Sequence, residues 1–177
     1  AAHSGQMDLA LQYLHRALSF HGSSAPLNVR AAELEYLMGR SDNATRLCRR
    51  ALRLDPHYCA AHHLLGRIAS YQLDLEPAAV HLRRGGECDP SLEEAWQDLA
   101  ALLWAQDRVE EYVQLLEAME PHIRDEGWVL RRRGVALLQL GDRDAAFDAL
   151  RQAVEIAPED RDALAVVPRP PLGGRLA

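Results

Sequence analysis

The chain has 177 residues, of which 48% are hydrophobic and 26% are charged, and its formal net charge is −6. This composition is typical of a folded globular protein with a core of its own. The acidic balance argues against a general nucleic-acid binder, because such domains are usually strongly basic, and no apolar run approaches the length of a membrane span.

Small residues recur along the chain at a constant interval of 34 residues. One series of positions holds, in chain order, Ala10, Ala44, Ala78, Tyr112 and Ala146. A second series, seven residues further on, holds Ala17, Ala51, Gly85, Met119 and Ala153. The copies follow one another without insertion or deletion, and a period of this length indicates a repeat protein in which each copy packs against the next.

We expect two amphipathic helices in every copy except the first. Only residues 1–4 precede the second helix of copy one, so its first helix is missing. Copy three shows the pattern most clearly, because apolar residues at three- and four-residue spacing run through 60–73 and small residues line one face of 76–85. In copy four an early proline, Pro121, predicts a shortened second helix.

The C-terminal residues depart from the repeat. Residues 159–166 are expected to form a short capping helix, and three prolines and two glycines predict a disordered tail over 167–177. No stretch alternates with period two, so we expect no strand. The predicted fold class is all-α, an α-solenoid of antiparallel helix hairpins.

The copies resemble the tetratricopeptide repeat (TPR), whose pattern reads W-x2-L-G-x2-Y, then A-x3-F, then P. Copy three matches it with His62, Leu65, Gly66, Ala69, Ala78, Leu82 and Pro90. Copy five matches it with Leu130, Arg133, Gly134, Leu137, Ala146, Leu150 and Pro158. The resemblance implies a right-handed superhelix, with a repeat domain over 1–166 that includes the short cap at 159–166.

The resemblance also implies a concave face that is lined by the first helices and binds an extended peptide or a partner's helix. At the family's groove positions this sequence places Arg30, Glu33, Tyr36, His63, Arg67, Tyr71, Glu94, Gln97, Asp98, Trp104, Trp128, Arg131 and Arg132. Arg and aromatic residues are enriched among the residues that dominate binding energy at interfaces. A solvated face with scattered Arg is the alternative interpretation of each single position. The Lys/Asn clamp of one family variant is absent, so binding of chaperone tails is not predicted.

From the groove we predict a non-catalytic interaction scaffold that holds a peptide or a partner protein, with no cofactor, no nucleic acid and no membrane insertion. The alternative is the repeat arm of a larger enzyme, such as a transferase or hydroxylase, with its catalytic domain outside this chain. A third possibility is a homodimer through the truncated first hairpin, using Leu11, Leu14 and Leu18, because exposed apolar stripes attract partners.

The chain has three cysteines, which are Cys48, Cys59 and Cys88. Because their number is odd and none has CxxC spacing, we expect reduced thiols. Cys48 stands at an apolar repeat position and is predicted to be core. Cys59 and His63 lie four apart on one helix with His62 adjoining, which is too few ligands for a tetrahedral metal site. Because no signal peptide is visible, we expect a cytoplasmic location. The periplasm is the alternative if the N-terminus is truncated.

All 20 basic residues other than His are Arg, and Lys is absent. This favours a GC-rich genome as the first explanation. It also changes the surface chemistry, because a guanidinium forks onto carboxylates where an ammonium acts as a point charge.

Overall fold

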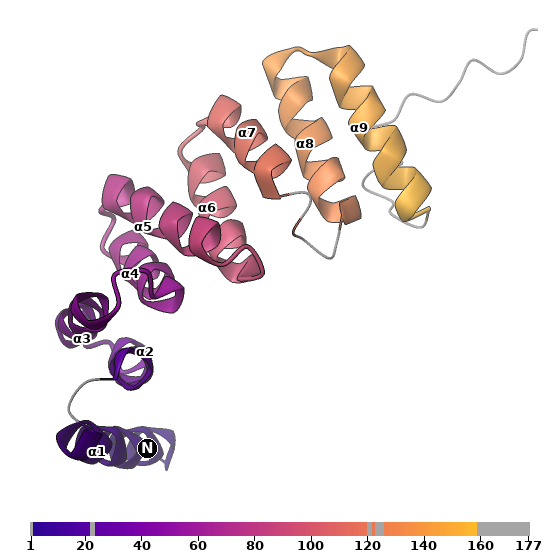
Figure 1. Ribbon diagram of the computed structural model, residues 1–177. Helices are drawn as coiled ribbons and strands as arrows, with labels where there is room; N and C mark the ends of the chain where they lie inside the picture. The colour runs from indigo at the N-terminus through magenta and orange to yellow at the C-terminus, as the bar shows by residue number, and fades with distance from the viewer. Residues whose placement is uncertain (1, 22–23, 120–121, 123–125, 159–177) are drawn as a thin grey trace, which may run out of the picture. The chain divides into compact units, whose positions relative to one another are not determined.

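The computed structural model describes residues 2–21, 24–119, 122 and 126–158, and within these it contains α-helices and no strand (Figure 1). In chain order the helices are α1 (Ala2–His21), α2 (Ala25–Leu37), α3 (Ser41–Leu54), α4 (Cys59–Tyr71), α5 (Leu75–Cys88), α6 (Glu93–Ala105), α7 (Val109–Met119), α8 (Glu126–Leu140) and α9 (Arg143–Ile156). The all-α helical repeat predicted from the sequence is confirmed. No helix in these ranges is both long and apolar enough to cross a membrane.

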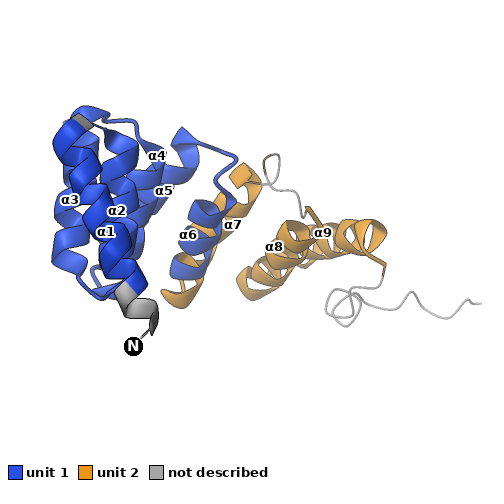
Figure 2. Ribbon diagram, turned by 90° about the horizontal axis from the view of Figure 1, so that it is seen from below, with its two compact units in different colours: residues 1–102 blue, residues 103–177 orange. Residues whose placement is uncertain are grey.

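The chain divides into two compact units, residues 1–102 and 103–177 (Figure 2). In the first unit, α2 pairs with α3 and α4 pairs with α5, while α1 packs on α2 and α3 packs on α4. In the second unit, α8 pairs with α9 and α7 lies against α8. Each unit is therefore built from antiparallel helix hairpins that cover one another's apolar faces. The continuous repeat domain over 1–166 stays a prediction.

The hairpin turns repeat the same backbone geometry every 34 residues. In each turn an N–H donates to the carbonyl oxygen five residues earlier, in the pairs Arg40–Glu35, Asp74–Ala69, Arg108–Leu103 and Asp142–Leu137. The residue before each donor has a left-handed backbone, with φ of 75° at Gly39, 61° at Leu73, 57° at Asp107 and 84° at Gly141. The period found in the sequence is therefore also the period of the hydrogen-bonded structure.

The repeated small positions lie in the core, as the spacing predicted. Ala44, Ala78 and Ala146 are fully buried, and Tyr112 is 1% exposed. Ala10, the first position of this series, is exposed. The side chains four residues after the buried positions of this series are also fully buried, namely Cys48, Leu82, Leu116 and Leu150.

Two predictions about helix ends have different outcomes. Helix α7 has 11 residues where α3, α5 and α9 have 14 each, and it ends at Met119, two residues before Pro121, as the early proline predicted. The predicted cap at 159–166 and the predicted tail at 167–177 lie outside the described residues.

The leucines of α1 that the sequence suggested as a dimer surface pack against other residues of the same chain. Leu11 and Leu18 are each 6% exposed and form a cluster with Ala31, while Leu14 packs against that cluster. The apolar residues that α1 exposes are instead Leu9, Tyr13 and Phe20, which are 50%, 63% and 73% exposed. The homodimer stays a prediction, but Leu11, Leu14 and Leu18 do not offer its surface.

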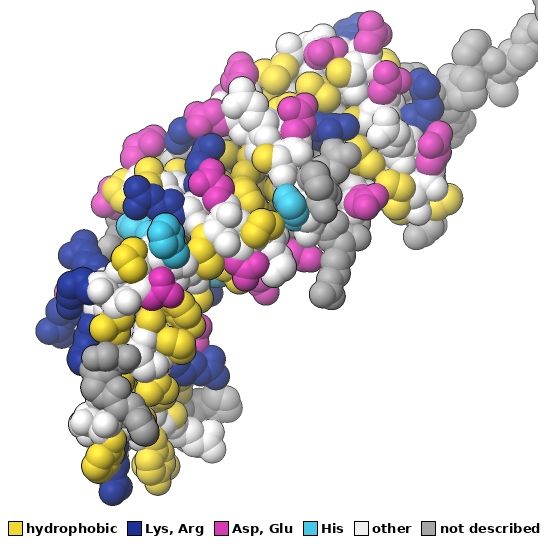
Figure 3. All heavy atoms as spheres, in the orientation of Figure 1, with side chains coloured by type: hydrophobic (Ala, Val, Ile, Leu, Met, Phe, Trp, Pro, Cys, Tyr) yellow, Lys and Arg dark blue, Asp and Glu magenta, His cyan; other side chains and the backbone are white. Residues whose placement is uncertain are grey.

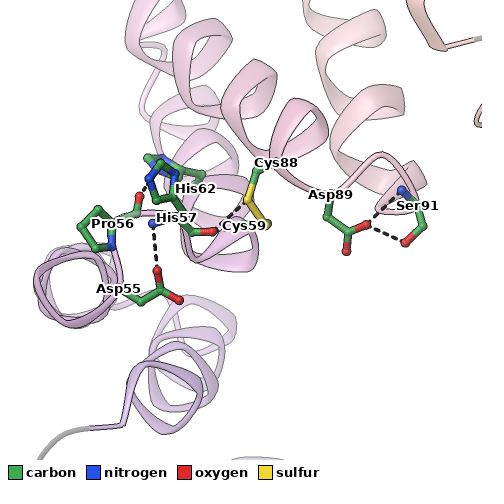
Figure 4. Close-up of a disulfide and its surroundings, with 8 residues drawn as sticks. All are labelled: Asp55, Pro56, His57, Cys59, His62, Cys88, Asp89 and Ser91. Carbon is green, nitrogen blue, oxygen red and sulfur yellow. Dashed lines mark hydrogen bonds between the residues drawn. A yellow bond between two sulfur atoms is a disulfide. The ribbon is translucent and has the colours of Figure 1, made fainter.

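Cys59 and Cys88 form a disulfide, so the prediction of reduced thiols is wrong for these two residues (Figure 4). Cys59 begins α4 and Cys88 ends α5, and the antiparallel hairpin brings their Cα atoms to 5.5 Å. Both sulfur atoms lie near the carbonyl oxygen of His57, at 3.3 and 2.8 Å. Cys48 is a free thiol in the core, and burial followed by the charge of Glu33 raises its pKa to about 12.

Candidate functional site

Helix α4 carries three of the predicted groove residues on one face. His63, Arg67 and Tyr71 follow one another at four-residue intervals, which places them on the same side of a helix. On that side Asp98 of α6 accepts from His63, with Nε2 to Oδ2 at 2.9 Å, and lies 3.8 Å from Nε of Arg67. One carboxylate of α6 therefore contacts two cationic or polar side chains of α4.

An aromatic contact extends this cluster to α2. The guanidinium of Arg67 lies over the ring of Tyr36, 5.4 Å from its centroid. Tyr36 also meets Tyr71 edge to face, with centroids 6.4 Å apart and an interplanar angle of 88°. Helices α2, α4 and α6 thus each contribute a side chain to this cluster.

These side chains line an open cleft of about 380 Å³. The lining residues are Tyr36, Arg67, Ser70, Tyr71, Asp98, Ala101 and Leu102. The walls are mixed, with aromatic and aliphatic surface beside one cation and one anion. Because Tyr71 is 72% exposed, an incoming side chain has an uncovered ring to pack against.

Three further predicted residues, Trp104, Arg131 and Arg132, meet in the other unit. Trp104, Tyr112, Arg131, Arg132 and Val135 line a cavity of about 170 Å³. The rings of Trp104 and Tyr112 lie 5.1 Å apart, and Arg132 stands 5.4 Å over the ring of Trp128. Burial raises the pKa of the Tyr112 phenol, while the neighbouring Arg132 and Arg131 act in the opposite direction.

The remaining predicted residues do not join either cluster. Arg30 and Glu33 pair with each other on α2, with a guanidinium nitrogen 2.8 Å from a carboxylate oxygen. Glu94 and Gln97 lie exposed on α6. Their groove positions were inferred from repeat numbering, which takes no account of pairing within one helix.

Sequence reasoning missed some residues of both hollows. Ser70, Ala101 and Leu102 line the cleft of the first unit, and Tyr112 and Val135 line the cavity of the second. A signal for the first three existed, because they lie three or four residues after Arg67 or Asp98 on the same helix. Tyr112 was interpreted only as a packing residue.

Another polar contact lies between α4 and α5. The Nδ1 atoms of His62 and His81 are 3.1 Å apart, so one ring donates and the other accepts. Burial, and after it the charges of His62, Arg84 and Arg49, lowers the pKa of His81 to about 4. Burial also lowers the pKa of His62. Within the described ranges no three His, Cys, Asp or Glu side chains gather as a metal site would require.

Comparisons with known proteins agree with this architecture. A family model of the tetratricopeptide repeat matches residues 128–160. A search of curated proteins found no match.

Several solved structures have a similar fold. The crystal structure of YrrB, described as a TPR protein with an unusual peptide-binding site, has 20% identity and a TM-score of 0.65 over 93% of this chain and 84% of that chain. MamA has 16% identity and a TM-score of 0.69 over 85% of this chain and 88% of that chain. TTC0263, a thermophilic TPR protein in Thermus thermophilus, has 19% identity and a TM-score of 0.57 over 91% of this chain and 88% of that chain.

The fold is therefore that of a helical repeat protein. Residues 128–160 match the tetratricopeptide repeat, and the fold of the chain is the one seen in solved TPR proteins.

Proposed function

We propose that the chain is a non-catalytic interaction module that holds an extended peptide, or a segment of a partner protein, in the cleft of its first unit. The observation that carries the proposal is the cleft itself, where Tyr36, Arg67, Tyr71 and Asp98 from three helices meet at one hollow. The peptide-binding site described for YrrB, which has a similar fold, supports the same class of function.

The chemistry of the walls indicates what kind of segment fits. Tyr71, Ala101 and Leu102 offer surface to one aromatic or aliphatic side chain. Arg67 lies 3.8 Å from its carboxylate partner, so its guanidinium can turn to a ligand carboxylate at a modest loss, because exposed ion pairs contribute only about 0–1 kcal/mol. We therefore expect an apolar anchor residue with an acidic neighbour.

Panning a display library of random linear peptides against the full chain tests this proposal. Enriched peptides should bind the variant R67A/Y71A at least about tenfold more weakly, because Arg and Tyr are the residue types that dominate interface energies. The matched control is Y13A/R16A, which removes the same two residue types from the exposed side of α1. Enriched peptides that bind R67A/Y71A as well as the unaltered chain would contradict the proposal.

The cavity of the second unit is a second place for the same kind of contact. Trp104 and Tyr112 form an aromatic wall beside Arg131, and a side chain of a partner segment would pack there. The substitution W104A would then weaken a subset of the enriched peptides and leave the others unchanged.

The disulfide bears on where the protein works. Disulfides persist in oxidising compartments and are rare in the reducing cytoplasm. The Cys59–Cys88 bond therefore favours an oxidising compartment over the cytoplasmic location predicted from the sequence. Alkylation of thiols in intact cells, followed by mass spectrometry of the two cysteines, distinguishes the two locations.

A further inference from the structure

Helix α3 presents a row of arginines on its outer side. Arg46, Arg49, Arg50 and Arg53 stand at intervals of three, one and three residues, and all four are exposed. Residues three, four and seven apart lie along one face of a helix, so the guanidinium groups form a stripe about 10 Å long. We call these four residues, together with Arg84 of α5, the arginine face.

Arg84 is grouped with these residues because it is exposed on α5, the second helix of the next hairpin. The charges of Arg49 and Arg84 both lower the pKa of the His81 side chain of α5. Figure 3 shows dark blue side chains gathered over α3 and again beside the histidines over α4 and α5. This surface is on the second helices of the hairpins, whereas the proposed peptide cleft is on the first helices.

The arginine face is compensated only in part, because Arg50 has a partner of its own. Among the described residues, no Asp or Glu lies within ion-pair distance of Arg49, Arg53 or Arg84. Arg46 donates to the amide oxygen of Asn43 and not to a carboxylate. The charges of Arg49, Arg53 and Arg84 are therefore left without an ion pair among the described residues, although the whole chain carries a net charge of −6.

The surface beside the arginines is hollowed and not smooth. A hollow of about 410 Å³ is lined by Arg46, Arg50 and Arg53, with His15 of α1 opposite. A second of about 350 Å³ is lined by Arg84 and Glu87 of α5, with His57 and His62. Glu35 in the first hollow is 4% exposed and lies 3.5 Å from Arg40, so its charge is already compensated. Each hollow therefore sets one or more guanidinium groups beside one carboxylate.

We propose that the arginine face is a second binding surface, which takes an acidic segment of a partner protein, rich in Asp and Glu. A planar guanidinium binds a carboxylate with two parallel hydrogen bonds, which gives geometry as well as attraction. A stripe of about 10 Å suits three or four carboxylates on one short segment. A nucleic acid or a membrane surface would extend past the stripe and meet the acidic remainder of the chain, which repels it.

Fluorescence anisotropy with two labelled peptides tests this inference on the full chain. One peptide alternates Glu with Gly and Ser, so that it has no apolar anchor for the cleft, and the other has Gln at each Glu. The Glu peptide should bind, and the variant R49Q/R53Q/R84Q should bind it at least about tenfold more weakly. Affinity should also fall when salt rises from about 0.05 M to about 0.3 M, because screening shortens the reach of the charges.

The matched control is R16Q/R143Q/R151Q, which removes three exposed arginines and the same total charge elsewhere. It should keep most of the affinity, and far-ultraviolet circular dichroism should show both variants folded. The cleft variant R67A/Y71A should bind the Glu peptide normally, which separates this proposal from the peptide cleft. Equal losses in the two triple variants, equal binding of the Gln peptide, or binding of oligo-dT or phosphatidylserine vesicles in place of the Glu peptide would overturn it.

Discussion

Gly66 of α4 faces Leu82 of α5 so closely that a Cβ atom on Gly66 would lie 2.6 Å from Cγ of Leu82 and 2.9 Å from its backbone nitrogen. The two helices of this hairpin approach as near as a glycine allows. Two periods further on, a Cβ on Gly134 would lie 2.5 Å from Cγ of Leu150. The repeated glycine and the repeated leucine are thus one contact, made in both units.

The substitution Gly66→Ala should destabilise the first unit by about 1–2 kcal/mol. Overpacking of this kind costs about 1–3 kcal/mol, and the better helix propensity of Ala returns up to about 1 kcal/mol. Urea unfolding followed by circular dichroism measures the change. In the background of Leu82→Ala, which removes Cγ, the cost of Gly66→Ala should shrink. A cost that is the same in both backgrounds would show that the clash with Leu82 is not its cause.

Leu73 occupies the left-handed position of its hairpin turn, with φ of 61° and a side chain that is 79% exposed. A left-handed backbone costs an ordinary residue about 1–2 kcal/mol. Against this gain, the greater backbone freedom of Gly stabilises the unfolded chain by about 0.4–1 kcal/mol. Leu73→Gly should therefore stabilise the protein by about 0.5–1 kcal/mol, seen as a higher urea midpoint. The reciprocal change Gly141→Leu, at φ of 84°, should lower the midpoint.

The sequence predicted the repeat because its cause is local. Small residues at a fixed interval report where two helix backbones must approach, and Ala44, Ala78 and Ala146 are indeed fully buried. The left-handed turns at Leu73 and Asp107 escaped notice because neither residue is the Gly that such a backbone prefers. At these two positions the packing of the hairpin overrides the local preference.

The candidate site was predictable to the extent that it lies on one helix. His63, Arg67 and Tyr71 share a face by their spacing alone. Contacts between helices were not predictable in the same way, such as the ring of Tyr36 under Arg67. The Cys59–Cys88 bond was missed for the same reason, because its partners are 29 residues apart and only the closed hairpin brings them together.

The disulfide should stabilise the first unit. Closing a loop of this length restricts the unfolded chain by about 3–4 kcal/mol in the chain-entropy model. Reduction with dithiothreitol, or the double substitution C59S/C88S, should lower the thermal midpoint of the protein. Cys48→Ser is the informative comparison, because it removes a buried thiol without opening a loop. A midpoint that does not move on reduction would contradict the prediction.

His81 should make the protein less stable in mild acid. Burial and neighbouring charge lower its folded-state pKa to about 4, from 6.5 for the ordinary side chain. Between these values the unfolded chain binds the extra proton, so the free energy of unfolding falls as pH drops through this window. With the ring partly open to solvent, we expect about 1 kcal/mol to be lost between about pH 7 and pH 5.

The substitution His81→Gln removes the group that takes up this proton. The free energy of unfolding should then depend less on pH, measured as its difference in urea unfolding between about pH 7 and pH 5. Its stability at neutral pH is expected to fall slightly, because the contact with His62 at 3.1 Å is altered. The comparison variant is His15→Gln, at an exposed histidine of α1, which should keep the slope of the unaltered chain. If both variants retain the same slope, His81 is not the source of the acid sensitivity.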